Sequence, residues 1–362
     1  MNETLTKLKR MLNANSEEIS LPPYLLWTNG SFYHLTIRSC GCSYHKRGYC
    51  TVCDYGSGKR VTEEEIDVIF NSVFNNIDTS SIDLLVGSFG SLLDAAEIPT
   101  SVLLCILKNI SYRHFRTLTI ETHYETINEK RLKLIQTTVG NSVDSIMVEL
   151  GFESANPFVL ENCFNKKMDL SELERKMDLI SLFGMQPILN IFLGAPFLTQ
   201  REMLEDAVDS LNWAKNHKAY KVVVFPSNIK PNTVSNYLYE RGLYSPPSLW
   251  LLLEFLDAIS EEDLSMVELA WYGARQSQGN SLYAIPPRTC DKCRGILLNG
   301  LNDFCKFESF TERRKIIDNL IALQNICHCS DAHNENTVDN DMQSRILNQI
   351  AIIREEIQKH ES

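Results

Sequence analysis

The sequence predicts an α/β fold, namely a partial (β/α)6 TIM-type barrel followed by an α-rich C-terminal extension that contains cysteines. Two patterns indicate this class. Six short runs of mostly β-branched and other apolar residues alternate with amphipathic helical segments. Strands that are apolar almost throughout are typical of parallel sheets covered on both faces, and their alternation with helices is typical of βαβ units. The number of such runs favours a barrel or partial barrel.

Taken in order, the expected strands cover residues 32–39, 82–89, 117–122, 145–153, 187–194 and 220–226. Helices are expected over residues 62–77, 98–110, 127–139, 170–184 and 199–216. The first helix opens with Thr62 and has Glu65 three residues later, which is the spacing of a capping box. We therefore divide the chain into an N-terminal extension (1–31), the partial barrel (32–258) and a C-terminal extension (259–362) whose last part, 337–362, is an amphipathic helix.

The composition excludes several classes of protein. The 362 residues include 35 Lys and Arg against 46 Asp and Glu, a formal net charge of −11, and 44% of them are hydrophobic. These values exclude a disordered or collagen-like chain. An acidic chain repels nucleic-acid phosphates on average, so nucleic acid is an unexpected, though not excluded, partner. No apolar run approaches the ~18 residues of a membrane helix and the N-terminus has no apolar leader, so we expect a cytoplasmic protein with no membrane partner.

Eleven cysteines in a reducing compartment do not form a disulfide framework, so those that cluster are candidate metal ligands. Cys42, Cys50 and Cys53 lie close together in RSCGCSYHKRGYCTVCDYG, with Cys40 just ahead. Four-coordinate zinc would take a fourth ligand, from Cys40 or His45. Three thiolates alone would suit an iron–sulfur cluster with one open iron. The spacing does not decide between zinc and iron–sulfur. Cys105 and Cys163 are isolated, and we expect them to pack in the interior.

Polar residues also occur where the predicted strands end. In a (β/α) barrel these positions and the cysteine loop meet at one rim, where active sites lie. The residues are Gly87, Ser88, Phe89, Gly90 and Ser91 after the second strand, Glu121 after the third, Glu153 after the fourth, Asn190 in the fifth, and Ser227 with Asn228 after the sixth. A structural zinc has no reason to lie at this rim, so the location favours a working cluster. Asn190 interrupts an apolar strand, which indicates a hydrogen-bonding task in the lumen.

Several stretches, in this order, resemble one known superfamily. They are TIRSCGCSYHKRGYCTVCDYG, GSFGSLLDAAEIP, TIETHYETINEKRL, LGAPFLTQREMLEDA and VFPSNIKPNTVSNYLYERGLYSPPSLW, between about residues 32 and 250. The chain resembles the radical S-adenosylmethionine (SAM) superfamily, in the group that shares the core of the elongator-type, methylthiotransferase and nitrogenase-cofactor proteins. Within this group it is most similar to the archaeosine-synthase radical subunit and related proteins.

The resemblance implies a role for each candidate residue. Cys42, Cys50 and Cys53 would hold a 4Fe–4S cluster whose open iron binds SAM, and Cys40 would be a bystander or a spare ligand. Residues 87–91 would contact the SAM amino group, although relatives tend to read SFLD where this chain reads SFGSLLD. Glu121 and Glu153 would meet SAM or the substrate, and Ser227 and Asn228 would lie near the adenine. Glu121, Glu153 and Asn190 are the candidate catalytic residues. One electron from the reduced cluster would break a carbon–sulfur bond of SAM and give a carbon radical.

A second metal site is indicated in the C-terminal extension. Cys290 and Cys293 form a CxxC pair, and Cys327 and Cys329 follow one helical segment later. Together they could hold zinc or an auxiliary iron–sulfur cluster, with Cys305, His328 and His333 as spare donors. The alternative is that the two pairs never meet in space.

The sequence therefore predicts a radical SAM enzyme that acts on a small molecule or peptide in biosynthesis and receives electrons from a protein such as flavodoxin or ferredoxin. The net charge of −11 favours a small substrate over nucleic acid. Three alternatives stay open: a tRNA-modifying enzyme of the archaeosine-synthase type, transfer of a 3-amino-3-carboxypropyl radical, and a zinc-binding scaffold without catalysis.

Overall fold

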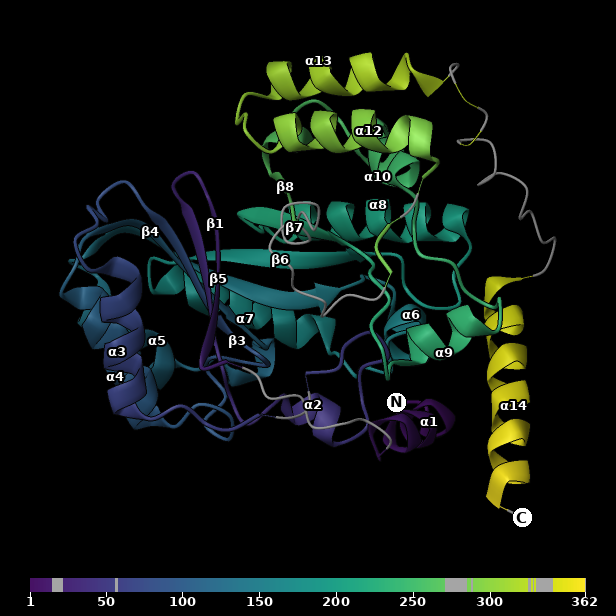
Figure 1. The fold of residues 1–362 in the computed structure, drawn as a ribbon, viewed down its shortest axis with the longest axis horizontal. Coiled ribbons are helices and arrows are strands. Elements are labelled where there is room, and N and C mark those ends of the chain that lie inside the picture. The colour runs from purple at the N-terminus through teal and green to yellow at the C-terminus, as the bar shows by residue number, and fades with distance from the viewer. Residues whose placement is uncertain are drawn as a thin grey trace.

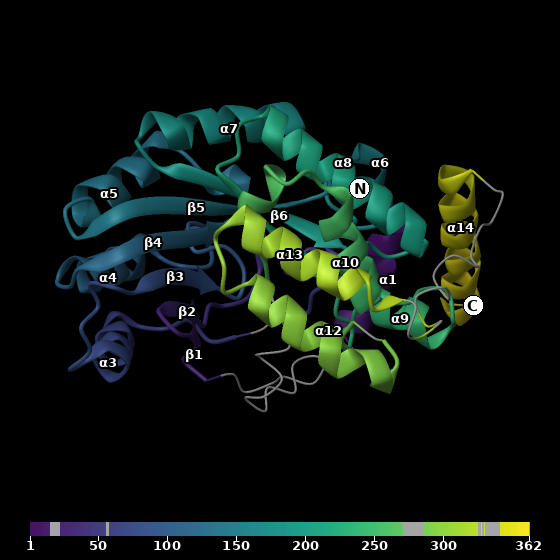
Figure 2. The same cartoon turned by 90° about the horizontal axis from the view of Figure 1, so that it is seen from above.

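The computed structural model of the protein describes residues 1–14, 22–55, 58–270, 285–287, 289–324, 327, 329 and 341–361. Eight strands form one sheet in the order β1-β2-β3-β4-β5-β6-β7-β8, so strands that follow one another in sequence lie side by side. β1 (Tyr24–Asn29) is antiparallel to β2 (Phe32–Ile37), and every later pair is parallel. The sheet is curled, and because β1 and β8 (Val267–Leu269) lie at its opposite edges, it forms an open half-barrel rather than a closed one (Figures 1 and 2).

The strands between these edges are β3 (Asp83–Ser88), β4 (Phe115–Thr122), β5 (Val143–Glu153), β6 (Gln186–Leu193) and β7 (Lys221–Pro226). Strands β2 to β7 coincide with the six predicted strands, so the partial-barrel prediction is confirmed. The two additional strands had weak sequence signals. β1 is half-buried without a clear alternation, and β8 has only three residues.

The helices that connect the strands cover the outer face of the sheet (Figure 2). α3 (Glu63–Phe74), α4 (Thr100–Ser111), α5 (Glu129–Val139), α7 (Leu170–Leu182) and α8 (Gln200–Asn216) fall where helices were predicted. α3 begins with the expected capping box: the Glu65 N–H donates to Thr62 Oγ1 at 3.2 Å and the Thr62 N–H donates to Glu65 Oε2 at 2.8 Å. Short elements complete the connections: α2 (Ser43–Lys46), η1 (Tyr124–Thr126), α6 (Pro157–Asn162), α9 (Val234–Glu240) and η2 (Asp263–Ser265).

The remaining helices extend the barrel at its C-terminal side. α10 (Leu249–Ala258), α12 (Asp291–Phe304) and α13 (Phe310–Ile321) pack on one another beyond α8 (Figure 1). α14 (Met342–Glu361) is the described part of the predicted terminal helix and packs against α1 (Glu3–Ala14) and α6. Its buried residues recur at helical spacing, namely Ile346, Ile350, Ile353 and Ile357. None of the helices in the described residues is both long and apolar enough to cross a bilayer.

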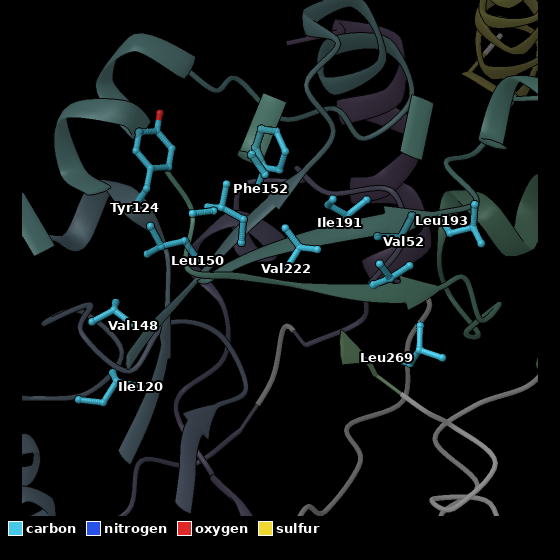
Figure 3. Packing of buried hydrophobic residues seen from close by; sticks show 14 of the residues in the cluster. Val52, Ile120, Tyr124, Val148, Leu150, Phe152, Ile191, Leu193, Val222 and Leu269 are labelled. Atoms are coloured by element: carbon cyan, nitrogen blue, oxygen red, sulfur yellow. The ribbon is translucent and has the colours of Figure 1, made fainter. Parts of the chain in front are cut away.

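The two faces of the sheet differ, because successive side chains of a strand point to opposite sides. On the outer face, Ile120, Val148 and Leu150 belong to one large apolar cluster with the helices (Figure 3). On the inner face, Leu85 and Ile188 are buried but lie outside that cluster. Glu121 and Glu149 are register partners, as are Gly151 and Asn190, so carboxylates and an amide lie on the inner side. The polar residues predicted to face the lumen are thus separated from the apolar core. Cys163 is fully buried and Cys105 packs against that core, as expected.

Candidate active site

The cysteine loop follows β2 and is fixed to the barrel by Thr51. The Thr51 hydroxyl donates to the Cys163 carbonyl at 2.6 Å, and its N–H donates to the Phe164 carbonyl at 3.2 Å. Cys50 has a φ of +64°, a conformation that a non-glycine residue adopts only where its surroundings impose it. The Cys53 thiol donates to the Cys50 sulfur across 3.4 Å, and this hydrogen bond lowers the pKa of Cys50 and raises that of Cys53.

The spacing of the three predicted ligands is wider than one metal ion requires. In the described residues, these thiols do not form a group whose sulfurs all lie within 4.8 Å of one another. Since Cys50 and Cys53 are 3.4 Å apart, the sulfur of Cys42 lies more than 4.8 Å from at least one of them. The three are nevertheless near enough to interact electrostatically. A 4Fe–4S cluster binds each cysteine on a separate iron, whereas one ion gathers its ligands. The three thiols at this rim therefore supply the donor set of a cluster, and the Cys50 and Cys53 sulfurs, 3.4 Å apart, would separate to bind different irons.

Of the two spare donors considered for zinc, Cys40 is hydrogen-bonded elsewhere, whereas Nδ1 of His45 is buried and has no hydrogen-bond partner in the described residues. The Cys40 thiol donates to the Ala96 carbonyl at 3.4 Å, and the Glu97 carbonyl lies 3.9 Å from the same sulfur. His45 is buried, and burial together with the nearby Lys9 lowers its pKa to about 4. Its ring is neutral at physiological pH.

Glu97 joins the cysteine loop to the glycine-rich turn after β3. Its carboxylate is buried and accepts the N–H of Ser43 and the N–H of Ser91, each at 2.8 Å. Burial raises the pKa of this carboxyl, and the two N–H donors oppose the rise. An ideal Cβ on Gly90 would lie 1.9 Å from Glu97 Oε2 and 2.9 Å from the Cα of Cys42, so only glycine fits between them. Sequence reasoning missed Glu97, because nothing in the order of residues shows that a carboxylate seven residues along fills the space beside Gly90.

The predicted turn residues divide into two kinds. Gly87 allows Glu121 to approach, because a Cβ there would lie 2.6 Å from Glu121 Oε2. The hydroxyl of Ser91 lies 2.5 Å from that of Thr122 and accepts the His123 N–H at 3.1 Å, so it secures the turn to β4. Phe89 is buried beside them. In contrast, the Ser88 hydroxyl oxygen is buried and lacks a hydrogen-bond partner in the described structure.

Asn190 and Asn228 show the same property as Ser88. The side-chain oxygens of both residues are buried without a hydrogen-bond partner in the described part of the chain. Neighbouring Ser227 is fully engaged, since it accepts the Tyr244 hydroxyl at 2.8 Å. Buried polar atoms are nearly always paired in proteins. Orphaned oxygens near the carboxyl ends of β3, β6 and β7 therefore indicate a place for a polar ligand along this rim.

Glu153 forms a buried ion pair at the end of β5. Its φ is +71°, and the register of β5 against β6 shifts at this point, so the bulge re-aims its side chain. Lys166 Nζ donates to Glu153 Oε1 at 2.6 Å, with side chains 9% and 14% exposed. Burial alone would lower the pKa of Lys166, but Glu153 and Cys50 raise it above its ordinary value. A fixed positive charge therefore lies beside the cysteine loop.

Two further features at the loop were not predicted. Lys9 of α1 is fully buried and donates to the carbonyl oxygens of Cys53 at 2.8 Å and Asn232 at 2.9 Å. Lys9 lies one helical turn from Leu5, a spacing that could have placed it on the buried face.

His123 lies with Nε2 3.8 Å from Cys42 Sγ and its ring 5.0 Å from that of Tyr44. Burial, then Lys166 and Arg47, lowers the pKa of His123 to about 3, so its ring is neutral.

The four cysteines of the C-terminal extension also meet in space. The ligand atoms of Cys290, Cys293, Cys327 and Cys329 all lie within 4.8 Å of one another. The alternative that the two pairs stay apart is therefore wrong. The spare donor Cys305 lies outside this group, and His328 and His333 lie outside the described residues.

Comparison with known proteins gives distant relatives. The chain is 24% identical over 324 residues to an uncharacterised protein of Methanocaldococcus jannaschii, covering 83% of this chain and 86% of that one. It is 23% identical over 224 residues to archaeosine synthase subunit beta of Methanosarcina acetivorans, covering 60% of this chain and 64% of that subunit. Among solved structures, coproporphyrinogen III oxidase of Escherichia coli, a radical SAM enzyme, is 14% identical with a TM-score of 0.40 and 81% of each chain covered. No family model matches the chain. The predicted similarity to the archaeosine-synthase radical subunit is thus confirmed.

Proposed function

We propose that the protein is a radical SAM enzyme whose 4Fe–4S cluster is held by Cys42, Cys50 and Cys53. The observation that carries this proposal is the meeting of three thiols, near enough to interact electrostatically, in the loop after β2 at the carboxyl rim of a half-barrel. Buried oxygens without partners lie along the same rim. Archaeosine synthase subunit beta, which shares 23% of aligned residues, supports the same class.

Each residue of the rim has a distinct task in this proposal. Cys42, Cys50 and Cys53 would hold the cluster, which would supply the electron for reductive cleavage of a carbon–sulfur bond of SAM and so the radical that takes hydrogen from the substrate. Ser88, Asn190 and Asn228 offer hydrogen bonds to the polar groups of SAM or substrate through atoms that are otherwise unpaired. Glu121, whose carboxylate fills the space beside Gly87, would accept from an amino or hydroxyl group of SAM or substrate. Glu97 keeps the cysteine loop and the turn in register.

Glu153 and Lys166 serve the loop electrostatically rather than as free catalytic groups. Their 2.6 Å ion pair occupies the charged atoms of both side chains. The positive end faces Cys50, whose charge contributes to the raised pKa of Lys166. The Lys166 charge lowers the pKa of Cys50, and the Glu153 charge raises it by less, so the pair as a whole favours a thiolate at Cys50. The predicted catalytic role of Glu153 is therefore better replaced, in this proposal, by a role in positioning Lys166.

We further propose a small molecule or peptide as substrate, since the net charge of −11 disfavours a broad phosphate-binding surface. The second candidate substrate is tRNA, as in the archaeosine-synthase alternative, and it is favoured by the similarity to two archaeosine synthase beta subunits at 23% identity. Salt dependence separates them, because binding of nucleic acid weakens steeply as salt rises and binding of an uncharged small molecule does not. The electron donor would be a small redox protein such as flavodoxin or ferredoxin.

The experiment is anaerobic reconstitution with iron and sulfide, followed by reduction with dithionite and chromatography of SAM products. The proposal expects 5′-deoxyadenosine from the unmodified chain and from Cys40→Ala, the matched control. It expects none from Cys42→Ala, Cys50→Ala or Cys53→Ala. Methylthioadenosine would assign the 3-amino-3-carboxypropyl alternative. A colourless zinc protein that leaves SAM intact would establish the scaffold alternative and refute the proposal.

A further inference from the structure

The four cysteines of the C-terminal extension come from two segments that a whole helical hairpin separates. Cys290 caps α12 and Cys293 lies in its first turn, whereas Cys327 and Cys329 follow α13. All four sulfurs lie within 4.8 Å of one another. The closest pairs join the two segments: Cys290 to Cys327 at 3.5 Å, and Cys293 to Cys329 at 3.6 Å.

These distances discriminate between the possible states of four cysteines. Disulfide sulfurs are about 2.05 Å apart, much less than either close pair. A tetrahedral zinc ion with Zn–S bonds of about 2.3 Å holds its sulfurs about 3.8 Å apart, close to the distances here. A 4Fe–4S cluster would bind each thiolate on its own iron and hold them farther apart. With all four sulfurs this close, the group in the extension needs no rearrangement to hold one metal ion. In the loop after β2, Cys50 and Cys53 lie 3.4 Å apart, but the three thiols do not all lie within 4.8 Å of one another.

We propose that Cys290, Cys293, Cys327 and Cys329 form a structural zinc site, closed by four thiolates and independent of the SAM chemistry proposed for the rim. With four protein ligands no coordination position remains for a substrate. The site fastens the segment after α13 to the beginning of α12 by joining Cys293 to Cys329, which are 36 positions apart in the chain.

The surroundings supply the outer contacts that zinc thiolates need. The indole N–H of Trp250, which is 1% exposed, donates to Cys329 Sγ at 3.2 Å. The Thr289 hydroxyl lies 3.6 Å from the same sulfur. Hydrogen bonds to a thiolate spread its charge and orient the ligand. A buried tryptophan needs a partner for its N–H, and here that partner is one of the four sulfurs.

Trp250 also links this site to the barrel. It lies in the first turn of α10, whose N-terminal segment sits on the end of β6: the Tyr244 hydroxyl donates to the Gly194 carbonyl at 2.6 Å. Pro247 approaches so closely that a Cβ on Gly194 would lie 2.7 Å from its ring. The zinc site therefore anchors the extension to α10 at the side of the barrel where β6 ends. Loss of zinc is expected to loosen α12 and α13 and leave the sheet folded.

The test uses the full chain with Cys42, Cys50 and Cys53 all replaced by Ser, so that the rim site cannot contribute metal. We expect one zinc per chain by elemental analysis after growth with both iron and zinc, and four sulfur neighbours at about 2.3 Å by X-ray absorption. In this background Cys293→Ser should lose the zinc, and Cys305→Ser, the matched control on the same helix, should keep it. If Cys293→Ser does not fold, zinc released from the parent variant by a mercurial reagent should appear as four thiols react.

The Trp250→Phe variant tests the outer contact, because it keeps the packing and removes the N–H. We expect its zinc affinity to fall 10- to 100-fold, measured by competition with a chelator. A brown protein with iron and sulfide in the triple-serine background would overturn the zinc assignment in favour of an auxiliary cluster. A folded triple-serine protein without any metal would overturn the site itself. Neither result affects SAM cleavage by the unmodified chain, so the two proposals fail separately.

Discussion

At the scale of single residues, Gly90 and Glu97 control the shape of the cysteine loop. A side chain at position 90 would collide with Glu97 Oε2 and with the backbone of Cys42. We predict that Gly90→Ala reduces iron incorporation after reconstitution by at least tenfold, since a displaced Glu97 releases the Ser43 and Ser91 N–H groups. Gly295→Ala is the control: a Cβ there meets nothing within 4 Å, and alanine favours the helix by up to about 1 kcal/mol. Equal iron content in both variants would refute this role.

The ion pair of Glu153 and Lys166 gives a second prediction. Lys166→Met leaves a carboxylate only 14% exposed without its partner, so we expect it to lower the free energy of unfolding by about 3–5 kcal/mol. The double variant Glu153→Gln with Lys166→Met removes both charges and should recover much of this loss. Urea unfolding of the metal-free protein measures both. If the double variant loses as much free energy of unfolding as Lys166→Met and Glu153→Gln lose together when measured singly, the two charges are not coupled.

At the scale of elements, a buried carboxyl connects the end of β5 to α8. Asp206 accepts the Ser154 hydroxyl at 2.6 Å, and burial raises its pKa to about 7 although that hydrogen bond opposes the rise. The folded state therefore binds this proton more tightly than the unfolded state. The resulting stabilisation is complete near pH 4 and is lost as the pH rises to about 7, by on the order of 4 kcal/mol at most.

We predict that Asp206→Asn removes this part of the pH dependence. The difference in unfolding free energy between the unmodified chain and the variant should favour the unmodified chain at pH 4 and decline toward pH 7. Taking the difference cancels the other groups that titrate in this range, including His123. Parallel curves over the whole range would show that Asp206 does not titrate there.

The helix α1 contributes directly to the proposed cluster site through Lys9. Its two hydrogen bonds tie the Cys53 carbonyl to that of Asn232, after β7. A buried cation near the thiolates favours the more reduced, more negative cluster. We predict that Lys9→Met lowers the reduction potential by on the order of tens of millivolts, while Lys7→Met, exposed on the same helix, leaves it unchanged. Equal potentials would mean that Lys9 acts only on the structure of the loop.

At the scale of the whole molecule, the order of the elements was readable from the sequence. Six apolar strands alternating with amphipathic helices predicted β2 to β7, because hydrophobic period is a local property of the chain. The hairpin strand β1 lacks such a period and the three-residue β8 is too short to show it. The helix α1 does have a helical period, with Leu5 and Leu8 buried, but was not predicted. The edges of the sheet therefore became known only from the structure.

The candidate site was predictable in part for the same reason. The residues near strand ends, including Glu121, Asn190 and Ser88, were found because a parallel sheet brings its carboxyl ends together. The partners of these residues were not, since contacts such as Glu97 with Ser91 or Lys9 with Cys53 depend on how distant loops fold. Cysteine spacing predicted two candidate metal groups, and only the structure shows that the four C-terminal sulfurs all lie within 4.8 Å of one another while the three loop sulfurs do not.

The central claim is that Cys42, Cys50 and Cys53 hold a cluster with an open iron that binds SAM. It is tested most directly by the electron paramagnetic resonance spectrum of the reconstituted, reduced protein, recorded with and without SAM. The account predicts a 4Fe–4S signal that changes on addition of SAM in the unmodified chain and in Cys40→Ala, and no such change in Cys42→Ala. A cluster signal that SAM leaves unaltered in the unmodified chain would contradict it.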